Sequence, residues 1–336
     1  MFNKIYDAIK NFIIDNYKFL IAWLIILFLF FYELPYVIYT PGGIVNLEDR
    51  IVVNGEEDIT GGSLNMSYVS LVKGTIPMLL LSYIIPNWDI LPSEEITRED
   101  ESVDELLELE KLYMTSSIDN ATILAFRKAN KELNITREVN NIVYIADEAK
   151  TDLKIYDELL SVDGKTVSTV DELREYINTL RAGDSVTLLV NRDGREKECR
   201  AEVYKTSDGL KVGISFLTTY EYETIPEIEV STKASESGSS GGLMLSLAIY
   251  NAISDEDITK GRIIVGTGTI DILGNVGEID GVKYKLLGAH KNDAEIFLCP
   301  MENYEEALQV KEEFDLDIAI HGVATFDEAL EYLLNN

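Results

Sequence analysis

The chain has 336 residues, of which 59 are acidic and 29 are basic, and its formal net charge at pH 7 is −30. This length is enough for two or three domains, each with a hydrophobic core of its own. Because so negative a chain repels polyphosphates, we expect no nucleic-acid partner and no charge-driven attraction to anionic lipid.

The sequence carries no motif for a metal or a nucleotide. Its two cysteines, Cys199 and Cys299, lie in predicted strands, where a free thiol behaves as a small buried apolar group. There is no HExxH motif, no histidine, cysteine and carboxylate cluster at metal-ligand spacing, and no GxxxxGK[ST] phosphate loop. We therefore expect no metal, no cofactor and no ATP.

An apolar segment near the N-terminus is the first predicted element. Residues 19–32 contain no charged side chain, and apolar residues continue past Glu33 and Pro35 to Tyr39. Such a span is long enough to cross a bilayer, and tyrosines near both ends are typical of interfacial belts. No small-residue cleavage site follows, which argues against a removable signal peptide. We predict a cytoplasmic tail and one transmembrane helix within residues 1–39.

The distribution of basic residues predicts the orientation of this helix. Lys4, Lys10 and Lys18 precede the span, whereas only Arg50 follows it closely. Since cytoplasmic flanks carry the excess of lysine and arginine, we expect a cytoplasmic N-terminus. Everything after about residue 40 would then lie on the extracellular side of the cell membrane.

Residues 40–137 form a mixed α/β region with less regular patterns. Pro41-Gly42-Gly43 is expected to break the chain after the membrane, and alternation over residues 64–71 predicts a strand. Residues 104–112 and 118–133 have helical periodicity. The apolar run at residues 76–85 is interpreted as a core helix, with a lid or a membrane-facing surface as alternatives.

A small β-rich module with one helix is predicted over residues 138–208. Thr169 and Glu172 form a capping box at the start of a helix with an apolar face. Strands are expected at residues 142–146, 158–162, 185–190 and 196–203, with tight turns at Asp163-Gly164 and Asp193-Gly194.

This order of elements resembles a circularly arranged PDZ domain of the bacterial protease type. The resemblance implies that an extended peptide adds as a strand beside the helix. Tyr156-Asp157 stands where such domains usually have Gly-Asp, and no glycine-rich carboxylate loop is evident near Asn140. An internal peptide, or no peptide, therefore remain as alternatives to a C-terminal carboxylate.

The last region, residues 209–336, contains a turn of small residues that leads into an apolar helix over residues 243–253. The turn reads Ser237-Gly238-Ser239-Ser240-Gly241-Gly242. It places a hydroxyl at a helix N-terminus, where unpaired N–H groups and the helix dipole favour developing negative charge. The pattern is typical of a nucleophile or an anion site.

A serine nucleophile needs a base, and lysine is the better candidate in this sequence. The only histidines, His290 and His321, show no recognisable Ser/His/Asp pattern. A lysine in an apolar setting has a lowered pKa and can act as a neutral base. Lys283 and Lys285 start a predicted helix directly after a glycine turn.

Three motifs in order resemble the proteolytic domain of Lon peptidases, which cleave peptide bonds with a Ser-Lys dyad. The motifs are Gly238-Ser239-Ser240-Gly241-Gly242, Gly266-Thr267-Gly268-Thr269-Ile270, and Gly274-Asn275-Val276-Gly277-Glu278-Ile279-Asp280-Gly281-Val282-Lys283-Tyr284-Lys285. The resemblance implies Ser240 as nucleophile and Lys283 as general base, with a separation of 283 − 240 = 43 residues. It also implies that Thr267 lies near the dyad as an auxiliary residue, and that backbone N–H groups of Ser239, Ser240 and Gly241 bind the oxyanion.

The motifs depart from the family at several positions. The family usually shows Gly-Pro-Ser-Ala-Gly, whereas Ser239 here replaces the proline and Gly241 the alanine. An acidic residue often precedes the nucleophile by three positions; this chain has Ser237 there and Glu236 one step further away. Ser239 remains an alternative nucleophile. Lys285 remains an alternative base, because it would point about 200° around the helix from Lys283.

The resemblance extends to a narrower family of membrane-anchored peptidases that join a PDZ-like domain to a Lon-type domain. Its further motifs are Tyr39-Thr40-Pro41-Gly42-Gly43, Ser67-Tyr68-Val69-Ser70 and Met114-Thr115-Ser116-Ser117. We therefore predict an α+β multidomain protein with a transmembrane helix, a mixed α/β region, a PDZ-like module and a Lon-type α/β proteolytic domain.

These observations predict a membrane-anchored, ATP-independent serine endopeptidase that cleaves extracytoplasmic peptides or flexible protein segments. One alternative is a membrane-tethered PDZ-type binding protein with an inactive peptidase domain. Another is a sensor whose peptidase site stays closed until a ligand docks. Lon-type domains often form rings, so the resemblance also implies a homo-oligomer as a candidate assembly.

Overall fold

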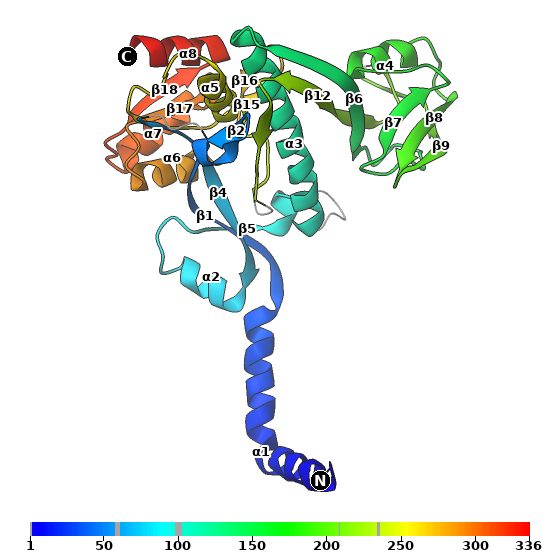
Figure 1. The fold of residues 1–336 in the computed structure, drawn as a ribbon. Coiled ribbons are helices and arrows are strands. Elements are labelled where there is room, and N and C mark those ends of the chain that lie inside the picture. Colours follow the sequence, from blue (N-terminus) through cyan, green and yellow to red (C-terminus); the bar gives the residue numbers. More distant parts are fainter. Residues whose placement is uncertain (1, 58–60, 98–102, 208, 234–235) are drawn as a thin grey trace.

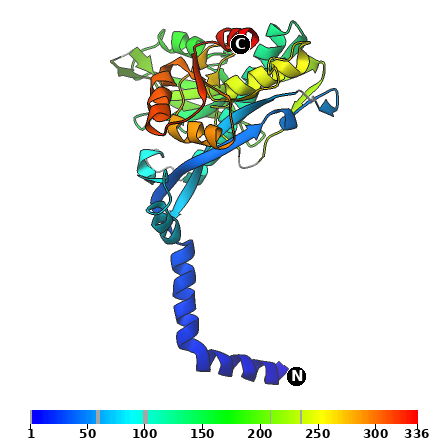
Figure 2. The ribbon, with the colours of Figure 1, turned by 90° about the vertical axis from the view of Figure 1, so that its left-hand side faces the viewer.

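The computed structural model describes residues 2–57, 61–97, 103–207, 209–233 and 236–336 (Figure 1). A long N-terminal helix projects from a globular part, which divides into a larger α/β portion and a smaller β-rich unit (Figures 1 and 2). The chain is thus α+β and multidomain, as predicted.

Helix α1 (Phe2–Phe31) is the projecting element, and its described side chains are almost all exposed. Its segment Ile5–Phe31 is long and apolar enough to cross a membrane by length and composition. The predicted continuation to Tyr39 is wrong, because strand β1 (Glu33–Asn46) begins two residues after the helix ends. Val37 and Ile38 are fully buried in that strand, so their apolar character serves the protein core.

A six-stranded sheet forms the centre of the larger portion, in the order β18-β17-β14-β4-β1-β5. Its strands are β1, β4 (Ser63–Thr75), β5 (Asp89–Pro92), β14 (Ile263–Gly266), β17 (Ile296–Pro300) and β18 (Ala319–Val323). Strand β4 runs antiparallel to β1 and parallel to β14. Three strands before residue 93 therefore complete a sheet whose other strands lie after residue 262, and the predicted division at residue 137 finds no counterpart in this sheet.

Helices cover both faces of this sheet. Along β14, Ile264 packs with helices α3 (Val103–Lys128), α5 (Gly242–Ile253) and α8 (Phe326–Asn335). The next residue, Val265, packs on the opposite side with α6 (Val282–Lys291) and α7 (Tyr304–Glu313). The alternation follows the period of a strand that is buried on both faces.

Three local expectations for the region before residue 137 are corrected. The two predicted helices are one helix, α3, which ends at Lys128 and is followed by strand β6 (Glu132–Ile145). Pro41-Gly42-Gly43 does not end an element but forms an irregularity inside β1. A Cβ atom on Gly42 would lie 2.0 Å from the Tyr68 carbonyl oxygen, so glycine is required for the close approach of β4. The third correction concerns α2 (Ile76–Ser82), which has no buried residue.

The β-rich unit is a five-stranded sheet in the order β12-β6-β7-β8-β9, with its own apolar core. Besides β6, its strands are β7 (Glu158–Val162), β8 (Ser185–Arg192), β9 (Arg195–Glu202) and β12 (Ile214–Ile225). Helix α4 (Val170–Ile177) begins at the predicted capping box, where Thr169 Oγ1 accepts a hydrogen bond from Glu172 N at 3.1 Å. A hairpin of β10 (Tyr204–Thr206) and β11 (Gly209–Lys211) precedes β12.

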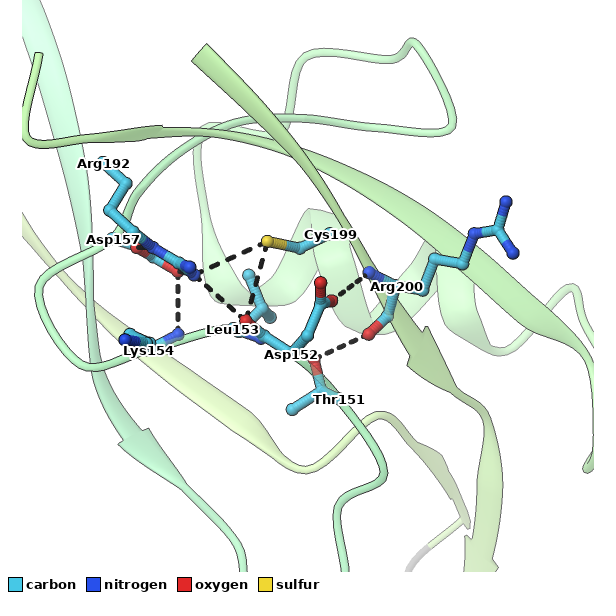
Figure 3. Close-up of polar contacts among 8 residues, drawn as sticks. All are labelled: Thr151, Asp152, Leu153, Lys154, Asp157, Arg192, Cys199 and Arg200. Atoms are coloured by element: carbon cyan, nitrogen blue, oxygen red, sulfur yellow. Dashed lines mark hydrogen bonds and ion pairs between the residues drawn. The ribbon is translucent and has the colours of Figure 1, made fainter. Parts of the chain in front are cut away.

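At Tyr156-Asp157, where such domains usually have Gly-Asp, the Asp157 carboxylate forms a buried ion pair with Arg192 (Figure 3). Tyr156 adopts φ of 73°, the left-handed conformation that the usual glycine would take. Asp157 is 1% exposed and binds Arg192 through two hydrogen bonds of 2.6 and 2.5 Å. It also accepts a hydrogen bond from Lys154 N at 2.8 Å. The motif therefore keeps its turn and its carboxylate without glycine.

The β6–β12 ribbon connects the two portions by packing on α3. Ser116 Oγ donates to the Thr218 carbonyl oxygen at 2.9 Å, and Asp119 accepts from Tyr220 N at 2.8 Å. Shorter elements complete the fold: β2 (Ile51–Val53), β3 (Glu56–Glu57), β13 (Ile228–Val230), β15 (Thr269–Ile270) and β16 (Val276–Gly277).

Candidate active site

The turn before α5 carries Ser240 as predicted from the sequence, and α3 holds this turn in place. Helix α5 is buried over almost its whole length, whereas Ser240 is partly exposed. Ser117 Oγ of α3 donates to the Ser239 carbonyl oxygen at 3.1 Å, and Gly238 N donates to the Glu110 carbonyl oxygen at 2.8 Å. Hydrogen bonds from α3 therefore hold the turn that carries the Ser240 hydroxyl.

Thr267, at the end of β14, fixes the backbone of Ser240. Its side chain is fully buried, and Oγ1 donates to the Ser240 carbonyl oxygen at 3.0 Å. The N–H group of Gly268 donates to the same oxygen at 2.7 Å. Two donors on one carbonyl oxygen leave the peptide plane of Ser240 little freedom to rotate.

Lys285 reaches the same threonine from α6. Its Nζ donates to Thr267 Oγ1 at 3.2 Å, and the residue is only 4% exposed. Burial lowers the pKa of Lys285 to about 8, although attraction by Asp280 and Glu110 opposes the shift. Lys285 therefore donates to Thr267, and Thr267 donates to Ser240. These two hydrogen bonds connect an amine of lowered pKa to the serine turn.

Lys283, which the family spacing indicated as the base, has different surroundings. Its Nζ lies 2.8 Å from Asp89 Oδ2, and its side chain is 31% exposed. Tyr284 Oη also donates to Asp89, at 2.6 Å, and although burial raises the pKa of Asp89, these bonds bring it below its usual value. Lys283 is therefore partly exposed and paired with a carboxylate of β5, whereas Lys285 is buried against Thr267.

The geometry therefore favours the alternative base, Lys285, over Lys283, because Lys285 is the lysine that contacts Thr267. Helix α6 follows Gly281, and two steps along a helix rotate a side chain by about 200°. Only one of the two lysines can face Thr267, and the buried one stands 285 − 240 = 45 residues after the serine. The 43-residue spacing could not reveal this, because it counts residues and not their direction on the helix.

The predicted oxyanion-binding N–H groups and the acidic residue before the turn can also be located in the structure. Within the described part of the chain, the backbone N–H groups of Ser239, Ser240 and Gly241 have no hydrogen-bond acceptor, which suits an oxyanion-binding turn. Glu236, the displaced acidic residue, forms an ion pair of 2.6 Å with Arg50. It therefore ties the turn to the segment after β1.

A groove of about 990 Å³ leads to Ser240 between β4, β1 and α3. Strand β4 pairs with β14 only from Ser63 through Met66, whereas its pairing with β1 continues to Thr75. The β4 residues from Ser67 to Leu71 line the groove on the side that β14 leaves unpaired. Such an edge can accept an extended peptide as an added strand.

A second pocket of about 630 Å³ lies in the β-rich unit between α4 and the start of β12. Among the strands that the structure describes, β12 lies at the edge of its sheet beside β6, and Leu173 and Ile177 of α4 supply an apolar wall. Gly213 lines this pocket with φ of 73°, and a Cβ there would lie 2.6 Å from Tyr204 Oη. Sequence reasoning sought the glycine loop near Asn140 and missed Gly213, although Gly213 does precede the alternating residues of β12.

The histidines lie elsewhere. The ring of His321 stacks on Tyr332 at 3.8 Å between centroids, and burial lowers its pKa. His290 is in the last turn of α6. Among the residues described by the structure, no group of three histidine, cysteine or carboxylate side chains could hold a metal ion.

Comparisons with known proteins agree with this architecture. Residues 220–336 match the family model of the Lon protease (S16) C-terminal proteolytic domain, and residues 125–203 match that of the PDZ domain. The Lon protease of Haemophilus influenzae is 32% identical over 99 residues, and that of Campylobacter jejuni is 38% identical over 98 residues. These segments are 30% and 29% of this chain but only 12% of either relative.

Solved structures similar to part of the chain are bacterial PDZ domains. The PDZ domain of the SdrC-like protein from Listeria monocytogenes is 17% identical, and the match covers 25% of this chain and 93% of that domain, with a TM-score of 0.23. A comparable PDZ domain from Listeria innocua gives 17% identity and a TM-score of 0.22, with 23% and 92% of the two chains covered. On the family matches, the C-terminal part of this chain carries a Lon protease (S16)-type proteolytic domain, and a PDZ domain lies ahead of it.

Proposed function

We propose that this protein is a membrane-anchored serine endopeptidase that cleaves extracytoplasmic peptides or flexible protein segments without ATP. The family match supports a serine-type peptidase domain. The observation that carries the finer proposal is the chain of hydrogen bonds from buried Lys285 through Thr267 to the Ser240 backbone. It supplies a base of lowered pKa beside a serine on a helix N-terminal turn.

The proposed reaction is acyl transfer through a Ser240–Lys285 dyad. Neutral Lys285 takes the proton of the Ser240 hydroxyl while Oγ attacks the scissile carbonyl carbon. The N–H groups of Ser239, Ser240 and Gly241 bind the oxyanion, and Thr267 orients the lysine. Lys285 then gives the proton to the leaving amine. Water, deprotonated by the same lysine, hydrolyses the acyl-enzyme and restores Ser240.

The groove beside β4 supports an extended substrate. Backbone groups of the unpaired β4 edge would bind the peptide main chain, so that side chains contribute less to recognition. This suits flexible segments more than folded proteins, because a folded protein has to expose a strand before it can pair. With no phosphate loop in the sequence, we propose cleavage that needs no nucleotide.

Peptide capture by the PDZ domain is the second candidate function. The pocket between α4 and the edge strand β12 has the elements that strand addition requires. If the PDZ domain captures a peptide and nothing else happens, the protein is a tethered binding protein. If peptide capture opens the peptidase site, the protein is a sensor.

Helix α1 supports anchoring to the cell membrane. We propose a single pass with a cytoplasmic N-terminus, since the basic residues precede the apolar span, and an extracellular catalytic domain. We also propose a homo-oligomer, on the analogy with Lon-type rings.

The decisive experiment uses the full chain in detergent micelles with a mixed peptide library and no ATP. The parent is compared with Ser240→Ala and Lys285→Met, where methionine keeps the buried volume, and with Lys283→Met as a matched control. We expect cleavage by the parent and by Lys283→Met, and none by the other two. Activity retained in Lys285→Met, or lost in Lys283→Met alone, would contradict the assigned dyad. No cleavage by any form, with peptide bound, would favour the binding protein.

A further inference from the structure

Helix α2 and the residues that follow it form an exposed apolar surface. Residues 76–88 contain no charged side chain, although 26% of the whole chain is charged. None of the α2 residues is buried, and Tyr83 and Ile84 just after the helix are 82% and 78% exposed. Exposed apolar residues this close together are typical of a surface that is covered by a partner or by lipid.

This surface lies next to the end of α1. Helix α2 contacts α1, β1 and β4, and it lies at the end of the globular part that is nearest to α1 (Figures 1 and 2). Large exposed side chains continue across the junction between α1 and β1, at Phe31, Tyr32 and Tyr36. The apolar surface of α2 is therefore continuous with the candidate membrane span.

Charged groups at the border of this surface form ion pairs. Lys73, at the end of β4 just before α2, lies 3.2 Å from Glu33 Oε2 and 2.9 Å from Asp104 Oδ1. These ion pairs stand where the chain turns from the polar globular part to the uncharged run. A lipid surface suits such a border, because paired charges can lie at headgroup level while apolar side chains enter below them.

We propose that residues 76–88 form a second membrane contact, which lies in the interface of the bilayer that α1 crosses. The inference rests on the proposed membrane insertion of α1. Tyrosine and tryptophan are the side chains preferred at this depth, and Tyr83 and Trp88 belong to the run. With two contacts, β1 and β4 are held at a fixed height above the membrane, and the groove that these strands line is held with them. Substrates would then be segments that reach this height.

Tryptophan fluorescence in vesicles tests the proposal on the full chain. The native tryptophans are Trp23 and Trp88. In a Trp23→Phe, Trp88→Phe background, Ile84→Trp places a probe on the proposed contact. Leu273→Trp is the matched control, since Leu273 is 71% exposed and lies in the chain between β15 and β16, two strands that are far from α1 (Figure 1). Each protein is reconstituted into phosphatidylcholine vesicles with and without brominated acyl chains, after its thermal unfolding has been shown to match the parent.

We expect brominated lipid to reduce the emission of the probe at 84 and to leave the probe at 273 unchanged. A third protein that keeps only Trp23 reports on α1. If Trp23 is not quenched, the membrane anchoring fails and the second contact fails with it. If Trp23 is quenched and the probe at 84 is not, the second contact alone is overturned. A blue-shifted but unquenched probe at 84 would assign the surface to a second copy of the chain, and would also overturn the proposal.

Discussion

The PDZ domain and the peptidase domain are assembled in contrasting ways. The strands of the PDZ sheet, from β6 to β12, come from one continuous stretch of chain, and β8 and β9 are joined by the tight turn at Asp193-Gly194. The peptidase sheet instead pairs β4 with β14, although their residues are about 200 positions apart, as in the Ser63 and Ile263 pair. Local sequence can specify the first kind of assembly, whereas the second depends on contacts that no local pattern encodes.

The largest expected effect sharpens this contrast through the buried ion pair of the PDZ domain. In Arg192→Met, the buried Asp157 keeps the hydrogen bond from Lys154 N but loses its ion pair, which costs on the order of 3–5 kcal/mol. We expect the PDZ domain to unfold at lower temperature, with the peptidase transition unchanged in calorimetry. Arg174→Met, which removes an exposed ion pair with Asp171, is the control and is expected to change neither transition. A single shared transition would show that the two domains unfold together.

Thr267 tests whether the peptidase site depends on its tertiary hydrogen bonds. Thr267→Val keeps the shape of the side chain but removes the bonds to Ser240 and Lys285. Loss of this positioning is expected to lower kcat about 100-fold, with little change in KM. Thr267→Ser, which restores the hydroxyl, is expected to recover most of the rate. Equal rates for the valine and serine variants would remove the threonine from the mechanism.

Asp119 joins the two regions, and its titration is expected to appear in the stability of the protein. Burial raises its pKa to about 6 from the usual 3.8, against hydrogen bonds from Tyr220 and Tyr222 that lower it. Because the folded pKa is the higher one, the stability is fully present below about pH 4 and is lost as the pH rises through about 6.

Asp119→Asn is therefore expected to stabilise the protein at pH 8 by up to about 3 kcal/mol, and to change little at pH 4. Chemical unfolding at the two pH values measures this difference. Asp327→Asn, at an exposed ion pair with Lys128, is the control. If the free energy of unfolding increased equally at both pH values, the effect would come from packing and not from the charge of Asp119.

The activity of the proposed dyad is expected to follow the titration of Lys285. Only the neutral amine accepts the proton of Ser240, and burial lowers the pKa of the lysine to about 8. The ratio kcat/KM should rise about tenfold per pH unit below that value and level off above it. In Lys283→Met the midpoint is expected to stay in place. A midpoint that moves in this variant would return Lys283 to the list of candidate bases.

The smallest expected effect concerns a purely local feature. Thr169→Ala removes the hydroxyl that caps α4 and should destabilise the PDZ domain by about 1 kcal/mol. Thr325→Ala removes the equivalent cap of α8, where Thr325 Oγ1 accepts from Glu328 N at 3.2 Å, and should act on the peptidase transition instead. Calorimetry of both variants would show whether each cap stabilises only its own domain.

Several features of the fold could be predicted because their causes are local. The capping box at Thr169, the turns at Asp163-Gly164 and Asp193-Gly194, and the buried helix after Gly241 all follow from residues within one turn of each other. The conformational preferences of glycine, aspartate and threonine are enough to specify them. The same locality made Ser240 recognisable on its turn.

The sequence by itself determined the α+β character, the helix and four of the strands of the β-rich module, and the resemblance of the C-terminal domain to Lon peptidases. Only the tertiary structure decided that Lys285, and not Lys283, faces Thr267, that Val37 and Ile38 belong to the sheet, and that α2 has no buried residue. An apolar or basic residue in sequence shows what it can bind but not which side of its element is covered. That is fixed by the packing of segments far apart in the chain: α6 packs on β1 and β4, and this packing turns Lys285 inward but not Lys283.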